Sequence, residues 1–183
     1  MIAVCSLWAH FNMNHVYSFT ITTVANKTAK PKHPTSVLVW GGISKRGHTD
    51  ILIFHKIMNS HFYQQGILQE TLVPFINDFH PDSHRLMQDN DPKHTSNSTK
   101  AYMEQYHINW WPTPPESPDL NPLEKAWKEL KDYAEVARTR DELEERILTF
   151  WGLLTVEKCE RYINHLPKVL PKVVENQGGP SGE

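Results

Sequence analysis

The sequence predicts an α/β domain in which helices flank a mixed β-sheet. Two observations support this fold class. Short apolar runs rich in β-branched residues alternate with longer segments whose apolar residues recur at helical spacing. With 183 residues, 39% of them hydrophobic, the chain is long enough to bury one core of ordinary size. The order of the elements then favours strands gathered in one sheet, with helices packed against it.

The strands are expected first in a hairpin and then as short single segments. Two apolar runs joined by a short Gly-containing turn, Lys45–His48, predict the hairpin. Tyr17–Val24 is also rich in β-branched and aromatic residues and is a further candidate strand. The other expected strands are Ser36–Ser44, Asp50–His55, Arg85–Asp89 and Ile108–Trp111.

Five helices are expected between and after these strands. The first begins at Asn59 or Ser60 and stops near His80–Pro81, and the fourth follows a capping box that begins at Thr139. The other three are Ser96–His107, Pro122–Val136 and Thr155–Leu166. This is the order of an RNase H-like domain whose opening strand is missing or replaced. We therefore expect an atypical segment over 1–30, an incomplete RNase H-like domain over 31–177, and a disordered tail over 178–183.

The charge of the chain is unevenly distributed. The net charge of −2 gives no overall indication of nucleic-acid binding. Met1–Thr49 contains no Asp or Glu, however, and carries five basic residues, Lys27, Lys30, Lys32, Lys45 and Arg46. Such a basic arm suits contact with a phosphate backbone, which makes Lys45 and Arg46 candidate DNA contacts. An ordinary solvated Lys-rich loop explains the same charges equally well.

Several other classes of protein are disfavoured. Cys5 and Cys159 are far apart and outside any C-x-x-C pattern, so neither a disulfide framework nor a zinc site is indicated. The apolar run Ile2–Ala9 is short and lacks a basic flank, and we expect no signal peptide. No apolar run approaches the length of a membrane span, and no membrane partner is expected.

Two acidic motifs carry the chemistry that the sequence suggests. Gln88–Thr95 places Asp89 at the end of a short strand, and Ser117–Glu124 places Glu124 in the first turn of a helix. Thirty-four residues separate the two carboxylates. Phosphodiester cleavage uses carboxylates that hold divalent cations around the attacked phosphate, and oxygen ligands suit Mg²⁺ or Mn²⁺.

Each of these residues also has a structural explanation. Asp89–Pro92 has the composition of a turn, and Glu124 stands where a helix-capping arrangement beginning at Asn121 would place an acidic residue. A lone histidine such as His94 is more often a surface or core residue than a ligand. The two motifs are specific only in combination.

In combination, the motifs resemble those of Tc/mariner DNA transposases. The segments 88–96 (QDNDPKHTS) and 117–131 (SPDLNPLEKAWKELK) are similar to the second and third acidic motifs of that family, with the spacing of its Tc-like branch. Upstream, 36–44 (SVLVWGGIS) resembles the preceding strand, and 157–163 (EKCERYI) resembles the closing helices. The resemblance covers about residues 31–183.

The resemblance implies an RNase H-like fold and cut-and-paste transposition. In that reaction water hydrolyses a strand at the transposon end, and the freed 3′-hydroxyl attacks target DNA. Asp89 and Glu124 would then be the second and third members of an acidic triad that binds Mg²⁺ or Mn²⁺, with Asn90, Lys93 and His94 in the same cleft. The implied partners are transposon-end and target DNA. The resemblance allows a homodimer, and a nuclear location if the source is eukaryotic.

The sequence departs from the family at its first acidic ligand. That ligand belongs on the opening strand, but the earliest carboxylate here is Asp50, which follows Ser36–Ser44. The bipartite helix-turn-helix region that precedes the family's catalytic domain also has no counterpart. We therefore expect the chain alone to be inactive, or nearly so, in strand cleavage. The alternative function is that of a domesticated, non-enzymatic module that binds DNA or protein.

Overall fold

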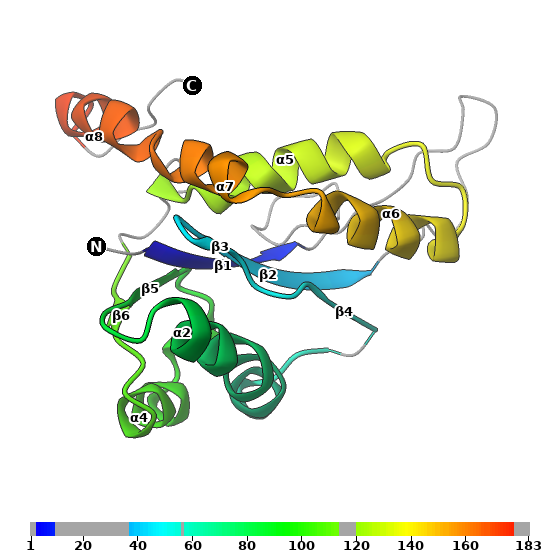
Figure 1. Cartoon of the computed structure of the whole chain (residues 1–183). Helices are drawn as coiled ribbons and strands as arrows, with labels where there is room; N and C mark the ends of the chain where they lie inside the picture. The colour runs from blue at the N-terminus through cyan, green and yellow to red at the C-terminus, as the bar shows by residue number, and fades with distance from the viewer. Residues whose placement is uncertain (1–2, 10–36, 56, 114–119, 178–183) are drawn as a thin grey trace.

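A mixed six-stranded sheet runs through the middle of the molecule (Figure 1). The computed structural model describes residues 3–9, 37–55, 57–113 and 120–177. The spatial order is β3-β2-β1-β5-β6, and β4 pairs with β2 beside β3. The expected hairpin and both short strands are confirmed with slightly shorter bounds, except that Gly47–His48, expected in the hairpin turn, form β3. The strands are β1 (Ala3–Ala9), β2 (Leu38–Ser44), β3 (Gly47–His48), β4 (Leu52–Phe54), β5 (Arg85–Gln88) and β6 (Trp110–Trp111).

Strand β1 occupies the centre of the sheet. It runs antiparallel to β2 and parallel to β5, so that Ser6 is paired with Gly42 on one side and with Gln88 on the other. Ala3–Ala9 therefore occupies the centre of the sheet, where the sequence predicted an opening strand that was missing or replaced. The apolar run Ile2–Ala9 was noted in the sequence but not predicted as a strand, because a short apolar segment has no periodicity that distinguishes a central strand. The candidate strand Tyr17–Val24 lies outside the described residues.

Helices cover both faces of the sheet (Figure 1). One core lies between the sheet and α5, α6 and α7, and the other lies under α1, η1, α2 and α4. Strand β2 serves both, since Val39 and Ile43 belong to the first core and Trp40 belongs to the second. No helix in the described part of the chain is both long and apolar enough to cross a membrane. The helices are α1 (Ser60–Phe62), η1 (Tyr63–Leu72), α2 (Val73–Phe79), α3 (Pro92–Thr95), α4 (Asn97–Gln105), α5 (Leu123–Ala134), α6 (Arg140–Gly152), α7 (Val156–Ile163) and α8 (Leu166–Glu175).

The first long helix begins and ends where the sequence predicts. Asn59 caps it by accepting a hydrogen bond from the backbone N–H of Phe62 (2.8 Å), and α1, η1 and α2 follow one another without a break. Its middle segment, η1, is a π-helix. The buried residues of η1 come in pairs every four positions: Tyr63 and Gln64, Ile67 and Leu68, Thr71 and Leu72. The wider turn of a π-helix, with its i→i+5 hydrogen bonds, keeps such pairs on one face.

The last expected helix, Thr155–Leu166, is wrong at its C-terminal end. Helix α7 stops at Ile163, and a separate helix, α8, begins at Leu166. Pro167 lies in the first turn of α8. Proline has no N–H to donate to the preceding turn, so it starts a new helix more readily than it extends one.

Candidate functional site

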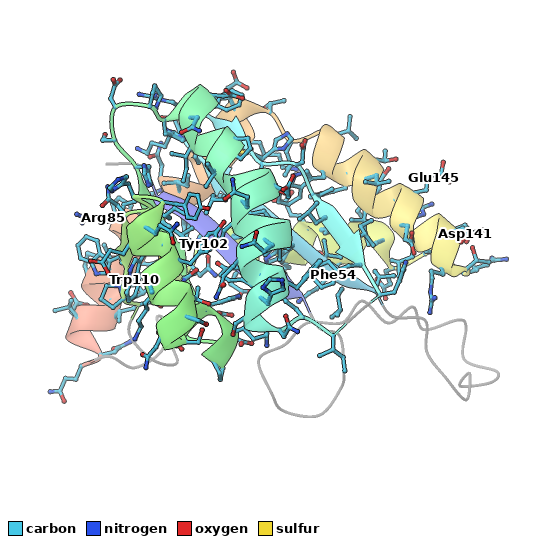
Figure 2. The ribbon with its side chains drawn as sticks, turned by 90° about the horizontal axis from the view of Figure 1, so that it is seen from below. Phe54, Arg85, Tyr102, Trp110, Asp141 and Glu145 are labelled. Carbon is cyan, nitrogen blue, oxygen red and sulfur yellow. The ribbon has the colours of Figure 1, made fainter. Side chains whose placement is uncertain are left out.

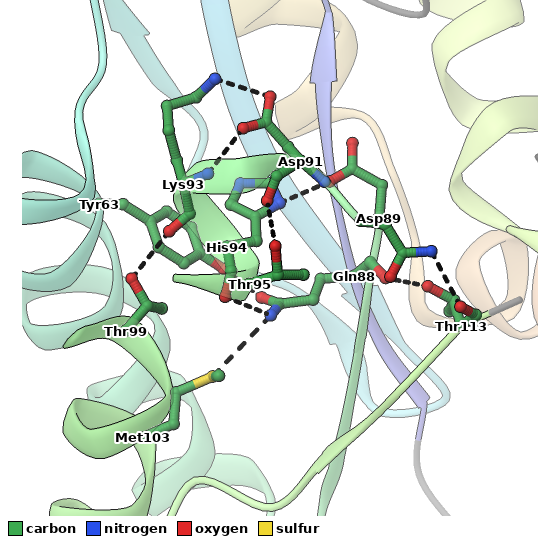
Figure 3. A network of polar contacts seen from close by, with 11 residues as sticks. Tyr63, Gln88, Asp89, Asp91, Lys93, His94, Thr95, Thr99, Met103 and Thr113 are labelled. Carbon is green, nitrogen blue, oxygen red and sulfur yellow. Dashed lines mark hydrogen bonds and ion pairs between the residues drawn. The ribbon is translucent and has the colours of Figure 1, made fainter. Parts of the chain in front are cut away.

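Asp89 directly follows the last residue of β5, and hydrogen bonds hold one of its carboxylate oxygens in place. Its Oδ1 accepts hydrogen bonds from the backbone N–H of Asp91 (3.1 Å) and from Nδ1 of His94 (2.5 Å) (Figure 3). The described residues offer no hydrogen-bond donor to its Oδ2, and the side chain is partly exposed. Asp89 therefore has a fixed orientation and one oxygen that is free to bind a ligand.

His94 is fully buried, and its ring packs against Tyr63 of η1. The rings of His94 and Tyr63 are 4.3 Å apart between centroids. The hydroxyl of Tyr63 donates to Oε1 of Gln88 (2.5 Å), and Nε2 of Gln88 donates to the backbone carbonyl of His94 (3.4 Å). In this conformation His94 donates a hydrogen bond to Asp89, and its side chain has no exposed surface that could contact DNA.

The turn after Asp89 is built by Asp91 and Lys93. Asp91 caps α3 by accepting from the backbone N–H of Lys93 (2.9 Å), and its other oxygen accepts from the Lys93 ammonium group (2.6 Å). Burial acts to raise the pKa of Asp91, but the hydrogen bonds from Lys93 and the nearby His94 outweigh it and lower that pKa. Asp91 therefore stabilises the turn that follows Asp89.

Glu124 stands in the first turn of α5. Asn121 orders this turn, because its side chain accepts from the backbone N–H of Leu123 (3.1 Å) and its carbonyl accepts from the N–H of Glu124 (3.1 Å). Glu124 is half-buried, and burial raises its pKa to about 7; Lys131 opposes this rise and the charge of Asp89 adds to it. The fold therefore brings Asp89 and Glu124 close enough for their charges to interact.

Strand β1, beside β5, offers no carboxylate to this site. Its last residue in register with β5 is Ser6, which pairs with Gln88, the residue before Asp89. The whole strand reads AVCSLWA and contains neither Asp nor Glu. Within the described ranges, no three His, Cys, Asp or Glu side chains lie close enough together to hold a metal ion.

The structure separates the predicted DNA contacts into two groups. Asn90 and Lys93 lie next to Asp89, and Asn90 donates from Nδ2 to the carbonyl of Thr113 (2.9 Å). Lys45 and Arg46 form the exposed turn between β2 and β3. By the register, this turn lies beside the beginnings of β1 and β5, at the opposite end of the strands from Asp89.

Arg46 already has a structural partner at that end. Its guanidinium donates to the carbonyl of Phe79 (2.5 Å), the last residue of α2. A cation at the C-terminus of a helix is favoured by the helix dipole. Arg46 is therefore not brought to the carboxylates by this fold.

Two supporting residues were missed from the sequence, Tyr63 and Gln64. Besides the contacts of Tyr63, Gln64 donates to the hydroxyl of Thr99 (3.1 Å), and Thr99 donates to the carbonyl of Lys93 (2.7 Å). Neither residue belongs to a motif. The only signal is that Gln64 stands four and eight residues before Leu68 and Leu72, at the spacing of a buried helix face.

The sequence matches the DDE superfamily endonuclease family over residues 15–145, which is most of the chain. The Tc3 transposase of Caenorhabditis elegans is 30% identical over 153 residues, which cover 79% of this chain and 45% of that protein. The Tcb2 transposase of Caenorhabditis briggsae is 26% identical over 148 residues, covering 80% and 54%. The chain thus spans about half the length of these curated relatives.

Solved structures of Mos1 transposase share the fold. The Mos1 paired-end complex with the left transposon end aligns with a TM-score of 0.76 at 18% identity, covering 98% of this chain and 55% of that one. The catalytic domain of Mos1 mariner transposase aligns with a TM-score of 0.73 at 18% identity, covering 96% and 82%. The predicted RNase H-like α/β fold is thereby confirmed.

Proposed function

The chain belongs to the DDE superfamily endonuclease family, in its Tc/mariner branch, and we propose that it binds transposon-end and target DNA through the face that carries Asp89 and Glu124. The observation that supports this proposal is that Asp89, which directly follows β5, and Glu124, in the first turn of α5, interact electrostatically. Thirty-four residues separate them in the sequence, yet the charge of Asp89 helps to raise the pKa of Glu124.

The donor set fits one divalent cation. Asp89 offers its Oδ2, and Glu124 is a neighbouring carboxylate whose charged form is disfavoured by burial and by the charge of Asp89. A cation between the two would relieve that repulsion, and carboxylate oxygens are the ligands that Mg²⁺ and Mn²⁺ prefer. When bound, such an ion would polarise the phosphate and promote attack by a hydroxyl group. Asp89 and Glu124 are the residues that would hold it.

The surrounding residues set the orientation of this pair. His94 and the backbone of Asp91 fix one oxygen of Asp89, so that its other oxygen is directed to the ligand. Asn90 and Lys93, beside the pair, are our candidates for contacts with the flanking phosphates. Lys45 and Arg46, at the far end of the strands, would meet DNA only beyond the reacting phosphate.

We further propose that this chain cleaves DNA weakly or not at all. Cleavage and strand transfer use two ions that bracket the phosphate, and a bridging ligand between them supports both. Leu7 follows Ser6 on β1, as Asp89 follows Gln88, and we infer that it lies level with Asp89, where a leucine cannot provide that ligand. Most of the electrostatic stabilisation of the transition state is then lost.

Nicking of supercoiled plasmid DNA in the presence of Mn²⁺ tests this proposal. We expect the parent chain to nick no faster than its Asp89→Asn variant. Nicking by the parent that Asp89→Asn abolishes would show that the carboxylate pair is correctly placed and that the predicted inactivity is wrong.

Restoring a carboxylate on β1 tests the position of the missing ligand. We expect Leu7→Asp to tighten Mn²⁺ binding about tenfold, or about 1.4 kcal/mol, as measured by isothermal titration calorimetry. Ser6→Asp is the matched control, since adjacent residues of a strand alternate between the two faces. Equal gains from Leu7→Asp and Ser6→Asp would mean that added negative charge alone, and not the register with Asp89, improves binding.

The proposed DNA binding also suggests how copies of the chain assemble and where in the cell the chain acts. The solved Mos1 paired-end structure contains a transposon end, and we propose that two copies of the present chain likewise meet on DNA as a homodimer. In a eukaryotic source the chain would act on chromosomal DNA in the nucleus. Sedimentation of the chain with and without duplex DNA distinguishes a dimer that forms only on DNA from one that forms without it.

A further inference from the structure

An arginine and a tryptophan are stacked on each other at the β6 edge of the sheet. Trp111 is the second residue of β6, which is the last strand on that side among the residues that the structure describes. Its side chain is 47% exposed, and the guanidinium of Arg85 lies 4.3 Å from the centre of its ring. In Figure 2, Arg85 and Trp110, the neighbour of Trp111, lie at the same side of the molecule.

This pair lies on the same face of the sheet as the carboxylates. Leu86 and Trp110 are register partners, and both pack into the core under η1 and α4. Met87 and Trp111 are also partners, and Met87 packs against the opposite core, under α5 to α7. Because side chains alternate along a strand, residues 85, 87 and 89 share that second face with Trp111. Asp89 is two residues beyond Met87, a step of roughly 7 Å along the strand.

A protein strand is a poor occupant for this edge. Pro112 follows Trp111 directly and has no N–H with which to pair an added strand. Trp110 already packs against the core, so the exposure of Trp111 is not needed to seal the fold. Positive charge flanks both tryptophans, with Arg85 over Trp111 and the ammonium group of Lys100 5.9 Å from the centre of the Trp110 ring.

The charge of Arg85 and the flat ring of Trp111 suit a DNA strand instead. A DNA strand that approaches Asp89 and Glu124 brings phosphates toward two carboxylates. Arg85, four residues before Asp89 and roughly 13 Å from it along the strand, offers a fixed cation to the part of the DNA strand that extends over this face. A guanidinium stacked on an aromatic ring keeps its N–H groups free for a phosphate. The indole offers a flat surface on which any unpaired base can stack.

We propose that Arg85 and Trp111 form a platform that holds an unpaired nucleotide on the face of the sheet that carries Asp89, a short distance along the strand from the phosphate at the carboxylate pair. Trp111 stacks on the base, and Arg85 contacts the backbone phosphate beside it. This inference rests on the proposed function, because it requires that the chain bind DNA on this face.

Fluorescence anisotropy with labelled oligonucleotides, in EDTA, tests the platform. The two probes are a duplex with a single-stranded 3′ overhang and the same duplex with blunt ends. We expect Trp111→Ala to weaken binding of the overhang probe about tenfold and to leave the blunt probe almost unchanged, while Trp111→Phe keeps most of the affinity. Arg85→Ala should weaken both probes and reduce the salt slope by about one.

Tyr106→Ala is the matched control. Tyr106 is another exposed aromatic residue, at the end of α4, where it stacks on Tyr102. Its removal should change neither affinity, and urea unfolding shows whether each variant is folded. If Trp111→Ala binds both probes as the parent does, or loses affinity for both equally, the platform is wrong while DNA binding stands. If the folded parent binds neither probe, the proposed function fails and the platform fails with it.

Discussion

At the scale of single residues, the site depends on how Asp89 and Glu124 differ in their surroundings. Asp89 is oriented by His94, whose ring is packed on Tyr63 and excluded from solvent. Glu124 is half-buried, and both burial and the charge of Asp89 favour its neutral form. Asp89 is therefore held in one orientation, while ionisation of Glu124 is disfavoured.

The raised pKa of Glu124 predicts a pH-dependent loss of stability. Its pKa is about 7 in the folded chain, against an ordinary value of 4.5. Since the folded chain binds this proton more tightly, the penalty is absent below pH 4.5, grows as the pH rises, and is complete above pH 7. Glu124→Gln removes it, so at pH 8 the variant's free energy of unfolding should exceed the parent's by about 1–3 kcal/mol.

Urea unfolding at pH 4 and pH 8 measures this difference. At pH 4 the parent and Glu124→Gln should have nearly equal free energies of unfolding. Glu145→Gln, at an exposed position of α6, is the control and should show no such change between the two pH values. A Glu124→Gln variant no more stable than the parent at pH 8 would mean that the carboxylate ionises without penalty.

At the scale of elements, β2 and α6 meet at a glycine. A Cβ atom at Gly41 would lie 2.6 Å from Cζ2 of Trp151. That indole is not free to move, because it stacks on Trp127 with ring centroids 5.5 Å apart and its Nε1 donates to the carbonyl of Thr49 (2.7 Å). The glycine is therefore what allows α6 to pack directly on the sheet.

We expect Gly41→Ala to lower the free energy of unfolding by about 1–3 kcal/mol, because a methyl group would overpack this contact. Equilibrium urea unfolding checks it. Gly152→Ala is the control: a Cβ there meets nothing within 4 Å, and alanine in a helix should be neutral or slightly stabilising. Equal stability of parent and Gly41→Ala would show that Trp151 can shift at little cost.

At the scale of the whole molecule, one central strand joins the two halves of the sheet. On one side, β1 pairs with the β2–β4 hairpin, and on the other it pairs with β5, which carries Asp89. Helices from the C-terminal half then cover the face on which β2 contributes Val39 and Ile43. Cooperative folding should therefore require β1, although it lies outside the family match at 15–145.

Ser6→Pro tests this dependence. Proline removes a backbone N–H from a strand that is paired on both sides, and we expect loss of the cooperative unfolding transition together with aggregation through the exposed edges. Ser6→Ala keeps the N–H and should unfold as the parent does. Circular dichroism and gel filtration measure both variants. A Ser6→Pro chain that still unfolds cooperatively would mean that the rest of the sheet is stable without β1.

Much of the fold could be predicted from local patterns. The hairpin, the long helix after Asn59 and the helix capped by Thr139 all follow from hydrophobic spacing and capping residues, and the structure confirms them. The break between α7 and α8 was missed, because the apolar stripe continues across it and only Pro167 marks the new start. Strand β1 was missed because its only signal is a short apolar run.

The sequence by itself determined the fold class, the family, and the two acidic motifs with their spacing, since these depend on residue types at fixed intervals. Only the tertiary structure decided which residues meet. It paired β1 with β5, so that Ser6 lies beside Gln88, the residue before Asp89, and it packed His94 and Tyr63 against each other next to that carboxylate. It also separated Arg46 from the carboxylates and placed Arg85 over Trp111. Such contacts depend on strand register and helix packing, which join residues far apart in the chain and leave no local pattern in the sequence.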